Sequence, residues 1–168
     1  MRYLYLAALT FAISGCATSY QKMGFSGGFE ETQLAPNVWK VSFSGNGYTR
    51  ASRAEEMTLL RSADLTLQNG FTFFALAGSS SSTDYSTVTT PTTSTTNANV
   101  YGGSGYASGT ATTTTTYGGH SYLVSKPSTT NTVVMYKNKP ETNAIIYDAA
   151  FLCRSMGTKF QVTCGSIK

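Results

Sequence analysis

The sequence is short of the residues from which catalytic and metal sites are built. Its 168 residues include one histidine, His120, three cysteines and eight Asp and Glu. A protein metal site needs several His, Cys or clustered carboxylate ligands. A serine-nucleophile triad would have to use His120 as its base, and no Gly-x-Ser-x-Gly motif accompanies it. The sequence therefore predicts a protein that is not an enzyme and that holds neither a metal nor a cofactor.

Charge is also scarce. Lys and Arg number 12 against eight Asp and Glu, which gives a formal net charge of +4. The basic residues are scattered along the chain rather than gathered in a run, so the electrostatic stripe typical of nucleic-acid binding is missing. We expect no nucleic-acid partner.

Long apolar runs are absent except at the start of the chain. Leu4 to Ile13 is almost wholly apolar, but a bilayer core of roughly 30 Å needs about 20 such residues. Arg2 before this run and the small residues after it are typical of a secretory signal. The stretch Ile13-Ser14-Gly15-Cys16 resembles the bacterial lipobox, which implies cleavage before Cys16 and acylation of its sulfur. An ordinary signal peptide with a chance cysteine is the alternative.

Acylation at Cys16 would fix the location of the protein. Each buried methylene contributes about 0.8 kcal/mol to membrane attachment, so the diacylglyceryl and amide-linked chains implied by the lipobox would make release negligible. Ala17 follows the cysteine where an aspartate would retain the protein in the inner membrane. By analogy with known sorting rules, we expect an anchor in the outer membrane of a Gram-negative cell.

Two further cysteines, Cys153 and Cys164, form an even pair in an oxidising compartment. A bridge across so short a loop would stabilise the fold by roughly 2–3 kcal/mol. Alternatively, Cys153 is a small buried apolar residue on a helix.

The remaining pattern predicts one domain. Residues 16–28 are small, polar and glycine-rich, which indicates a flexible tether after the signal peptide of residues 1–15. Residues 29–168 then alternate strand and helix signals. The expected strands lie on both sides of the Pro36-Asn37 turn, the second of them over 38–44, and then over 71–78, 120–127, 131–138 and 159–164. The expected fold is α+β, a two-layer arrangement of an antiparallel or mixed sheet with two helices on one face.

The two helices have different sequence signals. Ser52 and Glu55 have the spacing of a capping box, and the apolar stripe Met57, Leu60, Ala63 and Leu67 continues the first helix until Asn69-Gly70 ends it. The second helix is predicted over residues 143–157, with Gly157 as its stop.

Residues 79–119 differ in composition from the rest of the chain. They are almost all Ser, Thr, Gly, Asn and Tyr, and Asp84 is their only charged residue. Such a low-complexity insertion buries too little apolar area to offset its ordering entropy. We expect a mostly disordered excursion with ordered stems; the alternative is a polar hairpin that extends the neighbouring strands, since Thr and Tyr favour strands.

Two features of this chain suggest binding. Arg50 and Arg53 lie near the predicted start of the first helix, where they would hold an anion. Tyrosines spaced among Ser, Gly and Asn in the low-complexity tract would form an adaptable adhesive surface. The alternatives are a plain turn for the first and purposeless spacing in a flexible loop for the second.

Residues 24–76 resemble the N-terminal half of a family of small, uncharacterised proteobacterial lipoproteins. The resemblance rests on the lipobox, on the strand and turn PNVWKVSFSGNGYT and on the helix LLRSADLTLQNGF. It implies an envelope lipoprotein and brings no catalytic residues, because none is established for the family.

These observations together predict an outer-membrane lipoprotein with a non-enzymatic structural or protein-interaction role. Its expected partners are the membrane, through the N-terminal lipid, and other envelope proteins, with an accessory subunit of a secretion or envelope-spanning complex as one form. The alternative is a periplasm-facing lipoprotein that binds an anionic or glycan ligand.

Overall fold

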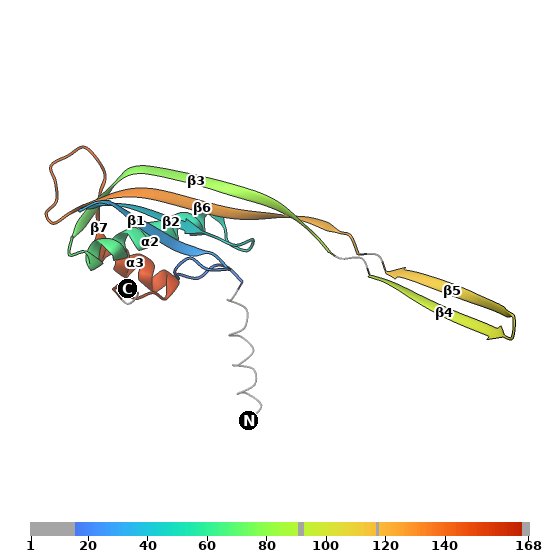
Figure 1. Ribbon diagram of the computed structural model, residues 1–168. Helices are drawn as coiled ribbons and strands as arrows, with labels where there is room; N and C mark the ends of the chain where they lie inside the picture. The colour runs from blue at the N-terminus through green and yellow to red at the C-terminus, as the bar shows by residue number, and fades with distance from the viewer. Residues whose placement is uncertain (1–15, 91–92, 117, 166–168) are drawn as a thin grey trace, which may run out of the picture. The chain divides into compact units, whose positions relative to one another are not determined.

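The computed structural model describes residues 16–90, 93–116 and 118–165 (Figure 1). The chain divides into two compact units, one formed by residues 1–84 with 125–168 and the other by residues 85–124. The elements are β1 (Gly28–Ala35), β2 (Val38–Ser44), α2 (Ala51–Gln68), β3 (Phe73–Thr89), β4 (Thr93–Gly103), β5 (Tyr106–Thr116), β6 (Ser121–Tyr136), β7 (Ile146–Asp148) and α3 (Ala149–Phe160). The expected α+β class with two helices and an antiparallel sheet is confirmed for these residues.

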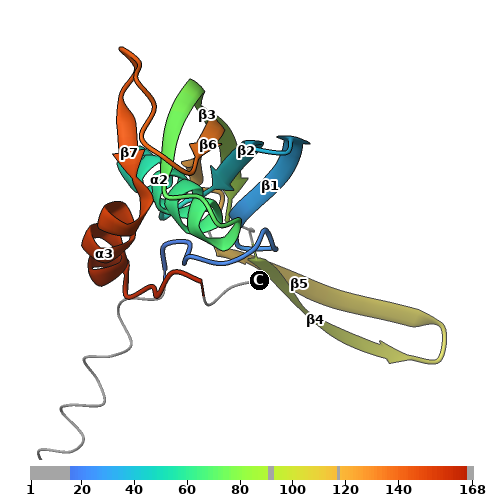
Figure 2. The same ribbon diagram turned by 90° about the vertical axis from the view of Figure 1, so that its left-hand side faces the viewer.

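One sheet forms the frame of the first unit. Its strand order is β1-β2-β6-β3-β7, and β1 with β2, β2 with β6, and β3 with β7 all pair antiparallel. The predicted turn at Pro36-Asn37 joins β1 to β2, and the predicted strand over 38–44 is β2. Side chains of β6 alternate strictly from Pro127 to Tyr136, so that one face of the strand enters the core. Figure 2 shows the sheet curling around α2.

Residues 60–66 of helix α2 are buried on all sides, because both the curled sheet and α3 pack against the helix. Met57, Leu60 and Ala63 of the predicted stripe are fully buried, but so are Thr58, Ser62 and Thr66. These three hydroxyls donate to the carbonyls of the residues four positions earlier, Ala54, Thr58 and Ser62. Each polar side chain thereby satisfies itself on the helix backbone, which lets a helix with polar residues enter the core.

The predicted capping box of α2 is wrong. Arg50 occupies the N-cap position with no side-chain hydrogen bond to the helix, and Ser52 lies inside the first turn. The carboxylate of Glu55 instead accepts a hydrogen bond from Ser81 of β3. A tertiary partner has replaced the local one that the spacing of Ser52 and Glu55 suggested.

The C-terminal elements also differ from prediction. β-Branched and aromatic residues favour strands, and residues 146–148 form β7 rather than the first turn of a helix. Asp148 then caps α3, because its carboxylate accepts a hydrogen bond from the backbone N–H of Phe151. Gly157 does not stop the helix, which runs to Phe160 and ends at Gln161 in the left-handed conformation, φ 56°. The predicted strand over 159–164 is wrong as well, because Lys159 and Phe160 belong to α3.

Gly157 has a packing role instead. A Cβ at this position would lie 2.5 Å from the carbonyl oxygen of Val162. The backbone N–H of Val162 also donates to the Gly157 carbonyl. The glycine therefore lets the chain after α3 fold back closely onto the helix.

The low-complexity tract forms strands in its described part. β3 continues to Thr89, and β4 and β5 make a separate two-stranded antiparallel sheet with an unbroken register from Thr93↔Thr116 to Gly103↔Tyr106. The expectation of a mostly disordered excursion is therefore wrong for these residues, and the alternative of a polar hairpin agrees with the structure. Thr and Tyr, which recur in this tract, are residues that favour strands.

Candidate functional site

Cys16 is the first residue that the structure describes, and it is exposed with a free thiol. Its backbone carbonyl accepts a hydrogen bond of 2.9 Å from Nδ2 of Asn46. The side chain of Asn46 is itself held, because its Oδ1 accepts from the backbone N–H of Tyr48 and from the hydroxyl of Thr49. The predicted signal peptide, residues 1–15, lies outside the described residues.

The residues after Cys16 are fixed to the domain, so the predicted flexible tether over 16–28 is wrong. Thr18 is buried, its N–H donates to Oγ1 of Thr49, and its hydroxyl donates to the carbonyl of Ser26. The N–H of Phe29 at the start of β1 donates to the carbonyl of Gln21. We call residues 17–27 the N-terminal strap.

Two glycines that suggested flexibility permit this close packing. Gly28 has φ of 143°, and a Cβ there would lie 2.5 Å from the Lys22 carbonyl oxygen and 2.6 Å from that of Gln21. Gly27 has φ of 93°, in the left-handed region that favours glycine. Their lack of a side chain brings the strap against β1.

A buried polar cluster holds the strap at Tyr20. The Tyr20 hydroxyl donates to Oδ2 of Asp64 at 2.7 Å, and NH1 of Arg61 donates to the same oxygen at 2.9 Å. Oδ1 of Asp64 accepts from Nε2 of Gln68 and from the backbone N–H of Gly165. Both Arg61 and Asp64 are fully buried. Asp64 thus joins the strap, α2 and the C-terminal segment at one carboxylate.

The same cluster reaches the sheet through Arg61. Its NH2 donates to the carboxylate of Glu31 on β1 at 2.8 Å, and its guanidinium lies 4.2 Å from the ring centroid of Phe29. Burial alone lowers the pKa of Arg61, but hydrogen bonds and charge at Glu31 and Tyr20 outweigh this and raise it. Burial, followed by the hydrogen bond to Asp64, raises the pKa of the Tyr20 phenol. The cluster therefore combines a phenol that keeps its proton with a cation that pairs with two carboxylates, Glu31 and Asp64.

Arg50 and Arg53, the predicted anion contacts, have different surroundings. Arg50 is exposed at the N-cap of α2. Arg53 is turned toward the strap: its Nε donates to the Thr18 carbonyl at 3.4 Å, and its guanidinium lies 5.1 Å from the ring centroid of Phe160. An anion would have to compete with these contacts for Arg53.

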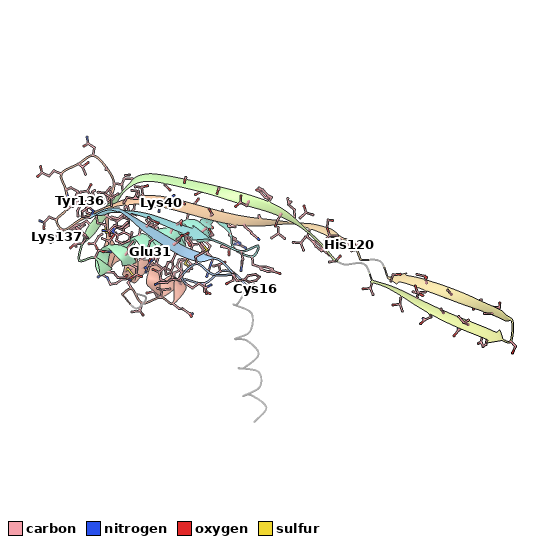
Figure 3. All side chains as sticks on the ribbon, viewed as in Figure 1. Cys16, Glu31, Lys40, His120, Tyr136 and Lys137 are labelled. Atoms are coloured by element: carbon pink, nitrogen blue, oxygen red, sulfur yellow. A yellow bond between two sulfur atoms is a disulfide. The ribbon has the colours of Figure 1, made fainter. Side chains whose placement is uncertain are left out.

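Two exposed or partly exposed glutamates form ion pairs. Glu31 of β1 binds Arg61, and Glu56 of α2 forms an ion pair of 2.7 Å with Lys159 of α3. His120 is exposed, and its described contacts are backbone hydrogen bonds with Thr90 (Figure 3).

Cys153 and Cys164 are joined by a disulfide, with their Cα atoms 6.1 Å apart. Of the two alternatives for Cys153, the structure has the bridged one. The bond ties the chain after α3 to that helix, one residue before Gly165 donates to Asp64. It thereby supports the buried cluster from the C-terminal side.

The hairpin of the second unit is a different kind of surface. Every side chain described in β4 and β5 is exposed, including Val100 and Tyr101 at 71% and 76%. Residues 85–125 contain no Asp, Glu, Lys or Arg. β4 and β5 pair only with each other in the described sheets, so the outer edge of each strand is left unpaired.

The sequence reasoning missed the strap contacts and the buried cluster. The signal that was present is the i, i+3 pair Arg61 and Asp64, which falls between apolar residues on a helix whose stripe was recognised. Opposite charges at that spacing form ion pairs, and next to buried positions such a pair can be buried as well as exposed. Thr18 and Tyr20 gave no comparable signal.

No protein-family model, curated protein or solved structure matches this chain. No helix within the described ranges is long and apolar enough to cross a membrane.

Proposed function

We propose that this protein is an outer-membrane-anchored lipoprotein of a Gram-negative envelope, with a non-enzymatic structural or protein-interaction role. The lipid would be carried by Cys16, whose exposed thiol suits acylation. Partners would be the membrane and other envelope proteins, and an accessory subunit of a secretion or envelope-spanning complex is one form of this role. The resemblance of residues 24–76 to small proteobacterial lipoproteins supports the same assignment.

The observation that carries the interaction role is the uncharged β4–β5 hairpin. An unpaired strand edge displays a row of N–H and C=O groups that can pair with another strand, and proteins usually block such edges with charges, proline or a bulge. An isolated two-stranded hairpin is also marginally stable in water. A strand added by a partner would satisfy the edge and stabilise the hairpin at once.

Site-specific photocrosslinking in intact cells tests this role. A photoreactive phenylalanine at Val100 in β4 should give an adduct with another envelope protein. The matched control is the same residue at Ile145, which is similarly exposed (73%) but lies in the first unit. Monomer alone at both positions would contradict an interaction role for the hairpin.

The anchor is tested separately. The intact mass of the protein from membranes should show acyl groups at Cys16, and Cys16→Ala should release the protein into the soluble fraction. Retention of the alanine variant in the membrane would refute lipid anchoring without bearing on the hairpin.

We also propose that the first unit has two layers with both helices on one face of the sheet, and that residues 79–119 are an insertion into it. Figures 1 and 2 draw α2 and α3 on the same side of the sheet. The hydrophobic core contains no residue from 85–124.

The alternative function, capture of an anionic or glycan ligand at Arg50 and Arg53, has less support because Arg53 already contacts Thr18 and Phe160.

A further inference from the structure

The chain leaves Cys16 with almost no slack. Cys16 is bonded through its carbonyl to Asn46, and Thr18, two residues later, is buried and bonded to Thr49. Two extended residues span at most about 7 Å. A lipid on Cys16 would therefore hold this end of the domain at the bilayer, whereas a long tether would let the domain move away.

Two exposed aromatic residues are connected to this point through neighbouring residues. Phe25 is fully exposed in the turn between Gly24 and Gly27, and Tyr48 is 75% exposed. Phe25 directly precedes Ser26, whose carbonyl accepts from the Thr18 hydroxyl. Tyr48 donates its backbone N–H to Asn46, the residue that holds Cys16. Both aromatic residues are thus attached to the groups that fix the first residues after the anchor.

Other exposed side chains at this end have matching chemistry. Met23 is 42% exposed in the same part of the strap, and Lys22 and Arg50 are exposed as well. Tyr is enriched at the boundary between hydrocarbon and water, and Phe is typical of the apolar face that interfacial segments bury there. Basic side chains are attracted to an anionic bilayer surface. We call these five residues with Cys16 the anchor face: Cys16, Lys22, Met23, Phe25, Tyr48 and Arg50.

We propose that the anchor face lies directly against the phospholipid surface, with Phe25 and Tyr48 inserted at the interface. This inference rests on the proposed acylation of Cys16. It adds that the strap fixes the orientation of the domain on the membrane, so the bilayer is a second contact surface and more than an attachment point.

The sheet register identifies the end of the domain that faces away. Ser44 pairs with Ser128 at the end of β2 next to Asn46, and Val38 pairs with Val134 at the other end. Figure 3 shows Cys16 at one end and Lys137 at the other. Ile145 follows Lys137 in the same connection between β6 and β7, so it is an exposed apolar control far from the anchor face.

Spin labelling of the full acylated protein in vesicles tests the proposal. With Cys16 acylated and Cys153 bonded to Cys164, a cysteine introduced by Phe25→Cys, Tyr48→Cys or Ile145→Cys is the single free thiol to label. The vesicles contain phosphatidylethanolamine and phosphatidylglycerol. Collision with dissolved oxygen, which concentrates in the bilayer, is compared with collision with a water-soluble nickel chelate.

We expect labels at Phe25 and Tyr48 to collide several-fold less often with the nickel chelate than the label at Ile145, and more often with oxygen. The proposal would be overturned if the labels at Phe25 and Tyr48 collided with the chelate as often as the label at Ile145. It would also be overturned if the label at Ile145 were as protected from the chelate as those at Phe25 and Tyr48. Intact mass and flotation of the same samples are read alongside. Loss of acyl groups or of flotation refutes the anchor itself, whereas an acylated, floating protein with a fully hydrated Phe25 refutes only the orientation.

Discussion

Replacing Tyr20 by Phe separates a folded strap from a flexible tether. The substitution removes one hydroxyl and keeps the ring, which packs 5.0 Å from Phe29 between ring centroids. It therefore opens no cavity. The lost interaction is the 2.7 Å hydrogen bond to the buried carboxylate of Asp64. A hydrogen bond to a charged group contributes about 1.5–3 kcal/mol to stability.

The loss of stability is limited to this one hydrogen bond, because Asp64 keeps its other donors. Arg61, Gln68 and Gly165 still donate to its carboxylate, so the charge is not left bare. We predict a loss of about 1.5–3 kcal/mol in the free energy of unfolding. For a chain of this size this corresponds to a decrease in Tm of roughly 3–12 °C.

Urea unfolding measures the difference directly. The protein carries Cys16→Ser so that it is studied without lipid, and Trp39, the single tryptophan, reports unfolding by its fluorescence. Tyr48→Phe is the matched control, because it makes the same chemical change at a residue that is 75% exposed. If Tyr20→Phe and Tyr48→Phe were equally stable, residues 17–27 would be a tether after all, and the account of the strap and of the anchor face would fail.

Four further predictions use the same unfolding assay. Because its pKa is raised, the folded Tyr20 phenol keeps its proton above pH ~10 while the unfolded one loses it; stability should fall there by up to about 1.4 kcal/mol per pH unit, and Tyr20→Phe should flatten that slope. Reducing the bond between Cys153 and Cys164 should cost roughly 2–3 kcal/mol, with no effect of reductant on the double alanine variant. Gly28→Ala should cost more than about 1 kcal/mol beyond Gly70→Ala, because both have positive φ but only Gly28 is crowded by carbonyl oxygens. Replacing residues 85–124 by a short turn should change the stability of the first unit by no more than about 0.5 kcal/mol, since the core has no residue there; a large loss would show that the hairpin supports the core.

Local periodicity was enough to predict the parts of the fold that depend on it. The turn at Pro36-Asn37, the strand over 38–44 and the apolar stripe of α2 all agree with the structure. The errors lie where a distant partner decides. Glu55 has the spacing of a cap but binds Ser81, 26 residues later. Residues 146–148 look helical but pair with β3, more than 70 residues earlier.

The prediction of disorder in the low-complexity tract was wrong for a different reason. Its composition was judged by the apolar area it can bury, which is the correct criterion for a core. The two stretches nevertheless pair in an unbroken register from Thr93↔Thr116 to Gly103↔Tyr106, although a two-stranded hairpin without a core is only marginally stable in water. Composition predicted that the hairpin contributes nothing to the core, and it could not predict the register.

The strap shows most clearly why part of the candidate site was out of reach of the sequence. Glycine in a polar stretch has two opposite meanings: freedom of the chain, or contact too close for a side chain. Gly28 has the second meaning, but only the positions of the Gln21 and Lys22 carbonyls reveal it. Thr18 and Tyr20 likewise look like linker residues until Thr49 and Asp64 are brought to them from 31 and 44 positions away. A short polar segment that precedes a domain is therefore better judged by whether the domain offers it buried partners than by its composition. Here the partners are the hydroxyl of Thr49 and the buried carboxylate of Asp64.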